Sequence, residues 1–244
     1  MIVDSIHVAA IAALATGAVC SAFILFDVIS RPQRMKVMNV VWPVTALFGT
    51  VLTLWTYLHY ARGSKPKALR NKAAVGNEES AGRKSPFPVV VAKGTLHCGA
   101  GCTIGDILAE WLAFLVPAVA VWFGWQALFA DKMYAVWILD FLFAFALGLA
   151  FQYFAIVPMR SLSPAAGILA ALKADTFSLL SWQIGMYGFM AFAQLYVFEH
   201  LLGHRAEVDT VEFWFAMQLA MVAGFVTAYP VNWWLIRSGV KEKM

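Results

Sequence analysis

The sequence has few charged residues for its length. Of its 244 residues, 13% are Asp, Glu, Lys or Arg, whereas 61% are hydrophobic, and the mean hydropathy is +0.72. A typical soluble domain has about 25% charged and about 45–50% apolar residues. A soluble chain of this composition could not cover its apolar residues with polar surface. The composition therefore excludes an ordinary soluble domain and indicates an integral membrane protein.

The sequence also lacks the motifs that would identify a nucleotide-driven pump or a membrane hydrolase. It has no Walker-type glycine loop, no G-x-G-x-x-G after a strand and no G-x-S-x-G elbow. A secretory signal is also missing, because the first apolar segment is too long and is preceded by no basic residue and followed by no cleavage site. We therefore expect a retained first helix and a protein that is not an enzyme.

Six apolar segments are long enough to cross a bilayer, which takes about 20 helical residues. These segments are Ser5–Ile29, Val37–Ala61, Thr103–Trp125, Val136–Val157, Ser163–Phe198 and Val211–Ile236. The fifth opens with Ser163-Pro164, an N-cap followed by proline at the first helical position. The prediction is an all-α bundle with about six spans. It has a two-helix hairpin in residues 1–61, a basic flexible cytoplasmic loop in 62–96 and a four-helix core in 97–244.

The basic residues lie between the apolar segments, so they indicate contact with anionic lipid headgroups rather than with nucleic acid. An even number of spans would place both termini on one side. That side would hold thirteen Lys and Arg residues, and the other side five: Arg31, Arg34, Lys36, Lys132 and Arg205. The bias predicts that both termini are cytoplasmic, although the Arg31–Lys36 cluster favours the opposite orientation.

Two of the three cysteines lie within six positions of each other, in His97-Cys98-Gly99-Ala100-Gly101-Cys102. We expect this segment to be a loop before the third span, in which the glycines let His97, Cys98 and Cys102 converge on one ion. Thiolates and imidazole favour soft or borderline ions such as Cu(I) and Zn(II), and His59 is a weaker candidate for a further ligand. Two alternatives remain open: a redox pair, and reduced thiols without a metal.

Two Met-x-x-x-Met pairs occur in the fifth and sixth spans. Met186 and Met190 share one face of their helix, as do Met217 and Met221. Thioethers are neutral and bind Cu(I), so four of them at similar depth would form a path for that ion. The alternative interpretation is ordinary packing, because methionine is a common apolar residue of helix interiors.

Other polar residues are weaker candidates. His200 and His204 are four residues apart and would share a metal if their segment is helical, although an ordinary solvated loop explains them as well. Asp106 and Glu110 follow the cysteines, where they would join a metal or proton relay or cap the start of the third span. We expect capping for Asp106 and leave the role of Glu110 open.

Three segments resemble a bacterial membrane family known as domain of unknown function 4396. They are the His97–Cys102 segment with Thr103-Ile-Gly-Asp106, the stretch Ile184–Met190, and Met217–Met221 leading into Gly224–Ile236. The resemblance covers about Leu96 to Met244. It implies a four-helix membrane core and a multi-pass protein of the bacterial inner membrane, but it implies no particular activity.

Together these patterns predict a membrane protein that binds and transports a soft metal ion, with Cu(I) first and zinc as the alternative. The expected partners are the lipid bilayer, the metal and a cytoplasmic metallochaperone, and a homo-oligomer is compatible with the sequence. Without an ATP motif, transport would be passive or coupled to a gradient. Two other functions are retained: a membrane thiol oxidoreductase that uses Cys98 and Cys102 with a quinone or a haem, and a structural or partner-binding protein without metal.

Overall fold

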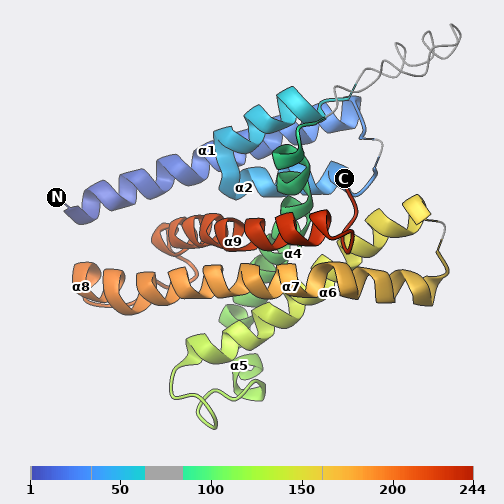
Figure 1. The fold of residues 1–244 in the computed structure, drawn as a ribbon. Helices are drawn as coiled ribbons and strands as arrows, with labels where there is room; N and C mark the ends of the chain where they lie inside the picture. The colour runs from blue at the N-terminus through green and yellow to red at the C-terminus, as the bar shows by residue number, and fades with distance from the viewer. Residues whose placement is uncertain (1, 34, 64–84, 161, 244) are drawn as a thin grey trace, which may run out of the picture.

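The computed structural model describes residues 2–33, 35–63, 85–160 and 162–243, and the regular elements in these ranges are helices (Figure 1). The predicted all-α bundle is therefore confirmed. The elements are α1 (Ile2–Ser30), α2 (Met38–Thr56), η1 (Tyr57–Ala61), α4 (Phe87–Leu115), α5 (Ala118–Trp122), α6 (Lys132–Arg160), α7 (Pro164–Phe192), η3 (Ala193–Phe198), α8 (Glu199–Leu202) and α9 (Val211–Arg237).

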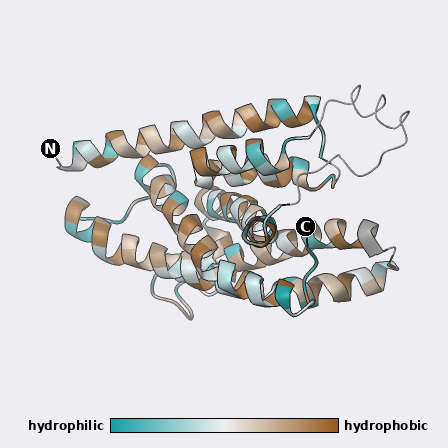
Figure 2. Ribbon diagram, turned by 45° about the horizontal axis from the view of Figure 1, so that its top comes forward, coloured by the Kyte–Doolittle hydropathy of each residue, from teal (hydrophilic) through white to brown (hydrophobic). Residues whose placement is uncertain are grey.

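Five segments in the described part of the chain have the length and hydropathy that a membrane span requires. They are Asp4–Ser30, Met38–Ala61, Phe87–Leu115, Lys132–Val157 and Val211–Arg237. Hydrophobic residues recur along each of the long helices (Figure 2). Helix α7 is less apolar, since it carries Asp175 and Gln183, but with η3 it extends alongside α9 through the bundle (Figure 1). These features show a multi-pass membrane protein.

Helix α4 differs from the third predicted span, Thr103–Trp125. It begins at Phe87, with proline in its first turn, and ends at Leu115, where the chain turns at Pro117 into the short α5. The predicted loop over 62–96 is therefore helical from Phe87 onward, while residues 64–84 lie outside the described ranges. The glycines and polar residues of this stretch do not interrupt the helix, because they are buried against neighbouring helices.

The bundle has two chemically different ends. At one end His7 of α1 pairs with Glu212 of α9 at 2.6 Å, so these two helices start together and run parallel. This end also carries a group of acidic residues, Asp131, Glu199, Glu207 and Asp209, and we call it the acidic end. The opposite end, where α1 and α9 finish, carries Arg31, Lys36, Arg62, Arg237 and Lys243, and we call it the basic end.

Helix α2 does not cross the bundle, although its length and hydropathy would allow it. The backbone leaves the helical conformation at Thr50, with φ 43° and ψ −125°, and the chain then turns back. As a result, Arg62 beyond its end pairs with Asp27 of α1 at 2.8 Å, and Tyr57 packs on Trp42 with ring centroids 5.7 Å apart (Figure 1). Both ends of this helical hairpin therefore lie at the basic end.

The turn at Thr50 frees backbone carbonyls inside the bundle, and side chains supply their hydrogen bonds. Gln218 of α9 donates from Nε2 to the carbonyl oxygen of Leu47 at 2.6 Å, and Thr53 donates to the carbonyl of Thr45 at 3.5 Å. Non-helical backbone at membrane depth is tolerated only where protein or water satisfies it in this way. The re-entrant turn of α2 is therefore held by the last helix of the chain.

Because α2 turns back, the helices in the described ranges that run from one end of the bundle to the other are α1, α4, α6, α7 and α9. An odd number of crossings places the start of α1 and the tail after α9 at opposite ends. The prediction that both termini lie on one side is therefore wrong. The same turn brings the Arg31–Lys36 segment to the end that also holds Arg62 and Arg237, so the conflict between the basic clusters disappears.

Helices α4 and α6 pack antiparallel and at very short distance. A Cβ atom at Gly101 would lie 2.6 Å from Cα of Gly148, and one at Gly105 would lie 2.5 Å from the backbone nitrogen of Ala144. Contacts this short leave no room for a side chain, which is why small residues meet here, as they commonly do between membrane helices. The close approach brings the polar residues on either side of these glycines into one layer.

Candidate ion pathway along helix α4

Four residues capable of holding a proton or an ion form a column along α4. Cys98, Cys102, Asp106 and Glu110 follow one another at intervals of four residues, so they lie on one slowly turning face of the helix. The first three are 0% exposed and Glu110 is 7% exposed. Twelve residues of helix extend about 18 Å, which is more than half of a hydrocarbon core of about 30 Å. We call these four residues the polar column.

The column starts, near the basic end, in a fully buried hydrogen-bond network. The ammonium group of Lys241 donates to Asp175 Oδ1 at 2.6 Å, to Asn232 Oδ1 at 2.8 Å and to the sulfur of Cys98 at 3.4 Å. Ser178 joins this network, with its hydroxyl 2.9 Å from Cys98 Sγ and 2.6 Å from Asn232 Nδ2. Three helices and the tail after α9 therefore meet at one charge pair.

The charge of Lys241 is stabilised despite its burial. Burial lowers the pKa of Lys241, but the attraction of the Asp175 carboxylate outweighs it, so that the pKa lies above its usual value. The ammonium group is therefore charged throughout the neutral range. The charged Lys241 therefore contributes its full stabilisation at every pH below the usual lysine pKa. This stabilisation is lost only as the pH rises above the raised pKa of Lys241.

Several other buried polar groups near this end have no hydrogen-bond partner among the described residues. Both ring nitrogens of His97 and both side-chain polar atoms of Gln152 belong to this group. The antiparallel register of Gly101 against Gly148 places Gln152, on α6, at the level of His97 on α4. Buried polar groups are usually satisfied, so His97 and Gln152 are exceptions at the same level of the bundle.

At the other end of the column, Asp106 and Glu110 of α4 come close to Asp140 of α6. Asp106 and Asp140 are 0% exposed and interact electrostatically with Glu110. The carboxylate oxygens of Asp106 have no hydrogen-bond donor among the described residues, and Asp140 lies within hydrogen-bonding reach of the carboxyl group of Glu110. Three buried carboxylates cannot all carry an unneutralised charge, because each would have to be removed from water at great cost. The cluster therefore requires a bound proton or cation.

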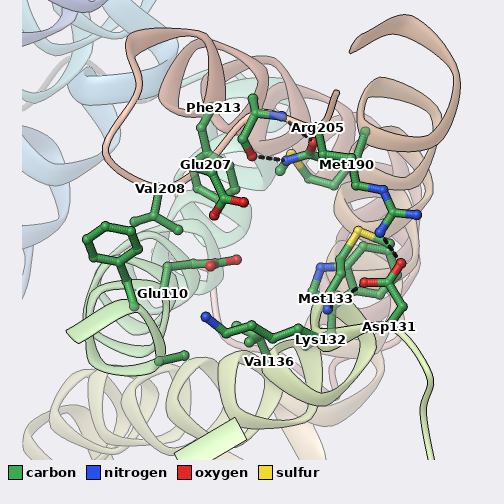
Figure 3. Close-up of a pocket in the computed structure, with 15 residues that line it drawn as sticks. Glu110, Asp131, Lys132, Met133, Val136, Met190, Arg205, Glu207, Val208 and Phe213 are labelled. Carbon is green, nitrogen blue, oxygen red and sulfur yellow. Dashed lines mark hydrogen bonds and ion pairs between the residues drawn. The ribbon is translucent and has the colours of Figure 1, made fainter. Parts of the chain in front are cut away.

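Glu110 connects this carboxylate cluster to a cavity at the acidic end. The cavity has a volume of about 160 Å³, and Lys132 and Glu207 line it together with Glu110 (Figure 3). Its wall is held by the ion pair between Arg205 and Asp131, which ties the segment before α9 to the start of α6. Glu110 is thus the member of the polar column that borders this cavity, whereas Lys241 occupies the basic end.

A second cavity of about 350 Å³ lies between α9 and the N-terminal helices. Met217 and Met221 line it, whereas Met190 lines the first cavity beside Glu110. The predicted methionine pairs are all buried in one hydrophobic core, which also includes Met186, but they border different spaces. Met221 accepts a hydrogen bond from the hydroxyl of Thr103 at 3.7 Å, so its thioether faces α4.

The predicted His-Cys-Cys loop is wrong, because His97, Cys98 and Cys102 lie inside α4. The two thiols are free and share the column, and Cys98 is in contact with the fixed positive charge of Lys241. Asp106 lies far from the start of α4, so the predicted capping role is also wrong. Within the described ranges, no three His, Cys, Asp or Glu residues are arranged to hold a metal ion.

The remaining histidines do not join the column. His59 stacks on Trp55 with ring centroids 4.8 Å apart, and its side chain is exposed. The shared helical face expected for His200 and His204 is not formed, because α8 ends at Leu202 and Gly203 has a φ of 73°. Each of these two imidazoles instead contacts a neighbouring backbone carbonyl, that of Tyr196 or Arg205.

The comparison with known families covers the whole polar column. Residues 89–241 match the family described as domain of unknown function DUF4396. The chain belongs to this family. The resemblance inferred from the sequence is therefore confirmed, and the DUF4396 region begins in the first turn of α4 and ends at Lys241. No curated protein matches this chain. No solved structure matches it either.

Several residues of this site were not predicted from the sequence. Asp175 lies in the fifth predicted span and Lys241 after the sixth, 66 residues apart, so that no local spacing pairs them. Asn232 and Ser178 carry no signal of their own, because single amides and hydroxyls are common in membrane helices. Asp140 and Asp175 do carry a signal, because each is an ionisable residue inside a predicted span.

Proposed function

We propose that this protein transports a cation across the membrane along the polar column of α4. The observation that supports the proposal is the uninterrupted series Cys98, Cys102, Asp106 and Glu110, buried at four-residue spacing between a cavity at one end and the Lys241 network at the other. Ionisable residues inside a membrane are costly and generally mark proton or ion pathways. A purely structural bundle would gain stability from apolar residues at these positions.

The chemistry of the carboxylate cluster favours a proton as the transported ion. Asp106, Glu110 and Asp140 can share one or two protons, and a proton on either of two neighbouring carboxyl groups converts a repulsive contact into a hydrogen bond. Glu110 exchanges the proton with water in the cavity, and Asp106 and Asp140 pass it inward. Without a nucleotide motif, the movement follows the gradient of the ion or is coupled to that of a second solute.

The direction follows from the basic residues. In bacterial-type inner membranes, segments rich in Lys and Arg stay in the cytoplasm, so the basic end is cytoplasmic and the cavity faces outward. The start of α1 then lies outside and Lys241 lies at the cytoplasmic end. A reporter that is active only outside the cytoplasm, fused before Ile2, gives signal under this orientation, and the same reporter fused after Lys243 gives none.

Proton flux into vesicles tests the proposed function. The protein is reconstituted into liposomes that contain a pH-sensitive dye, and a membrane potential is imposed with potassium and valinomycin. We expect wild-type flux to exceed that of empty vesicles, Glu110→Gln to lower it at least about 10-fold, and the exposed Glu199→Gln to leave it unchanged. Wild-type flux equal to that of empty vesicles, for protons and for the metal below, would refute transport along this column.

Cu(I) is a second candidate cargo, supported by a separate observation. Cys102, Met186, Met190, Met217 and Met221 all lie in one buried core, which offers soft sulfur ligands without a charge that must be buried. In this version the same vesicles take up Cu(I), and replacement of the four methionines by leucine abolishes the uptake. Uptake of Cu(I) that survives this change but is lost in Glu110→Gln would assign the path to the carboxylates alone.

A thiol oxidoreductase receives less support from the geometry. The sulfur of Cys98 is enclosed by Lys241, Asp175 and Ser178, and Cys102 is also fully buried. Thiol exchange requires that a partner reaches the sulfur atom. The absorption spectrum of the purified protein tests this alternative, because a haem or an oxidised quinone would give a characteristic band.

A further inference from the structure

The environment of the Lys241 ammonium group is a complete coordination shell. A primary ammonium has three N–H donors, and here each has its own acceptor: Asp175, Asn232 and Cys98. Ser178 fixes two of these acceptors, because its hydroxyl contacts both Asn232 Nδ2 and Cys98 Sγ. All of these side chains are 0% exposed. They come from three different helices, so the shell does not depend on the tail that carries Lys241.

The tail that carries Lys241 folds back onto the last turns of α9. After α9 ends at Arg237, the chain turns at Gly239, where φ is 75°, and the backbone nitrogen of Lys241 bonds to the carbonyl of Leu235 at 3.1 Å. Lys243, two residues further on, is exposed. The side chain of Lys241 enters the bundle beside Cys98, at the start of the polar column.

We propose that Asp175, Asn232 and Cys98 form a binding site for a small monovalent cation of the ammonium type, and that Lys241 occupies this site as a tethered substitute. A free cation that entered the site would take the place of the Lys241 ammonium group. The second oxygen of Asp175, which has no partner among the described residues, is available to such a cation. The site is a property of the three helices and remains when Lys241 is removed.

The position of this site gives it a role in the proposed function, on which this part of the inference rests. Lys241 places a fixed positive charge at the cytoplasmic end of the polar column, where it repels any cation that arrives from Cys102. The column is therefore closed while Lys241 is bound and conducts when the tail withdraws. A free cation that binds at Asp175 in place of the tail puts a positive charge at the same position, so the column stays closed while the site is occupied.

Removal of the lysine side chain and addition of methylammonium test the site. In Lys241→Ala, Asp175 loses its counter-ion, and we expect the melting temperature in detergent to fall by about 10 °C. Methylammonium at about 100 times its Kd restores about 5–10 °C, because it binds only the folded protein. The control Lys243→Ala, in the same tail but exposed, shows neither the fall nor the response. Recovery by the larger tetramethylammonium ion as well would refute a site with three hydrogen-bond acceptors.

A second variant keeps the test decisive if Lys241→Ala does not fold. The double variant Lys241→Met/Asp175→Asn removes both charges, so we expect it to fold and to show no response to methylammonium. If methylammonium neither stabilises Lys241→Ala nor allows its purification as a folded protein, the proposed site is wrong.

The vesicle assay separates this inference from the proposed function. We expect Lys241→Ala to raise cation flux at least about 10-fold over wild type and methylammonium to reduce it again by occupying the site. If methylammonium stabilises Lys241→Ala but no cation flux is seen in the vesicles, the site is supported and transport is refuted. The opposite result is that the wild type carries flux, but methylammonium neither stabilises Lys241→Ala nor blocks its flux. That result supports transport and refutes the site.

Discussion

The two ends of the polar column on α4 hold their buried charges in opposite ways. At the basic end, Lys241 and Asp175 form an ion pair that Asn232 and Cys98 complete, so each hydrogen of the ammonium group has an acceptor. At the acidic end, Asp106 has no hydrogen-bond donor among the described residues, and Asp140 lies beside Glu110, a third group of the same charge. One end is electrostatically complete, whereas the other gathers three carboxyl groups, of which Glu110 is close to the ammonium group of Lys132.

This difference separates structural charge from functional charge. A completed network is expensive to disrupt and resists exchange, because each member depends on the others. An incomplete cluster of like charges destabilises the fold, and such a cluster is retained where it binds a proton or an ion. The basic end is therefore expected to contribute stability and closure, and the acidic end is expected to exchange the ion.

The largest effect is expected from Asp175→Asn. This change leaves the ammonium group of Lys241 buried without a counter-ion, which typically costs about 3–5 kcal/mol. We expect the free energy of unfolding in detergent to fall by that amount, and the double variant Lys241→Met/Asp175→Asn to recover most of it. If Asp175→Asn is as stable as wild type, the network at the basic end does not stabilise the fold, and the proposed difference between the two ends is wrong.

A smaller loss is expected from Gly105→Ala, at the contact that holds the two ends in register. The added methyl group would lie 2.5 Å from the backbone nitrogen of Ala144, so α4 and α6 must separate, at a cost of about 1–3 kcal/mol. The matched control is Gly188→Ala, which meets no atom within 4 Å and should gain about 0.5–1 kcal/mol. Thermal unfolding of the two variants would show opposite shifts.

The opposite sign is expected at the acidic end. Asp106→Asn replaces an acid that lacks a donor by a neutral side chain of the same shape, and we expect stability to rise by about 1 kcal/mol while proton flux is lost. Parallel measurement of unfolding and of vesicle flux checks both statements. If Asp106→Asn is much less stable than wild type, Asp106 stabilises the fold as Asp175 does, and the two ends do not differ in this way.

The smallest effect concerns thiol reactivity. Cys98 and Cys102 are both 0% exposed, and we expect neither to react with a membrane-permeant maleimide in the folded protein. In Lys241→Ala, Cys98 loses one of its neighbours and should react first, with Cys102 unchanged. Mass spectrometry after labelling identifies the site. Equal labelling of both thiols in wild type would contradict their burial.

Local patterns predicted the helices well and their connections poorly. The sixth predicted span, Val211–Ile236, differs from α9 by one residue, because its apolar length and its Thr210 cap are both local signals. The start of α4 was missed by 16 residues, since glycine, lysine and cysteine suggested a loop. The prolines at positions 86 and 88 were the available signal, because proline is favoured in the first turn of a helix.

The site required information that no segment of the sequence contains. Lys241 meets Asp175 across 66 residues and Cys98 across 143, and neither partner is indicated by spacing. The column itself was partly visible, since Cys98, Cys102, Asp106 and Glu110 stand four residues apart. It was divided between a loop and a helix start, because the helix that unites these residues was not recognised. Pairings between distant buried charges depend on the packing of several helices and emerge only with the fold.

The re-entrant turn of α2 also determines the order in which the protein can be assembled. The carbonyl of Leu47, released by the break at Thr50, receives its hydrogen bond from Gln218, which is synthesised 171 residues later. Until α9 has entered the membrane, this carbonyl has no partner from that helix, and an unpaired carbonyl in lipid costs several kcal/mol. The re-entrant turn of α2 therefore cannot reach its final structure while only the N-terminal helices have been inserted. Insertion of α9, the last helix, completes it.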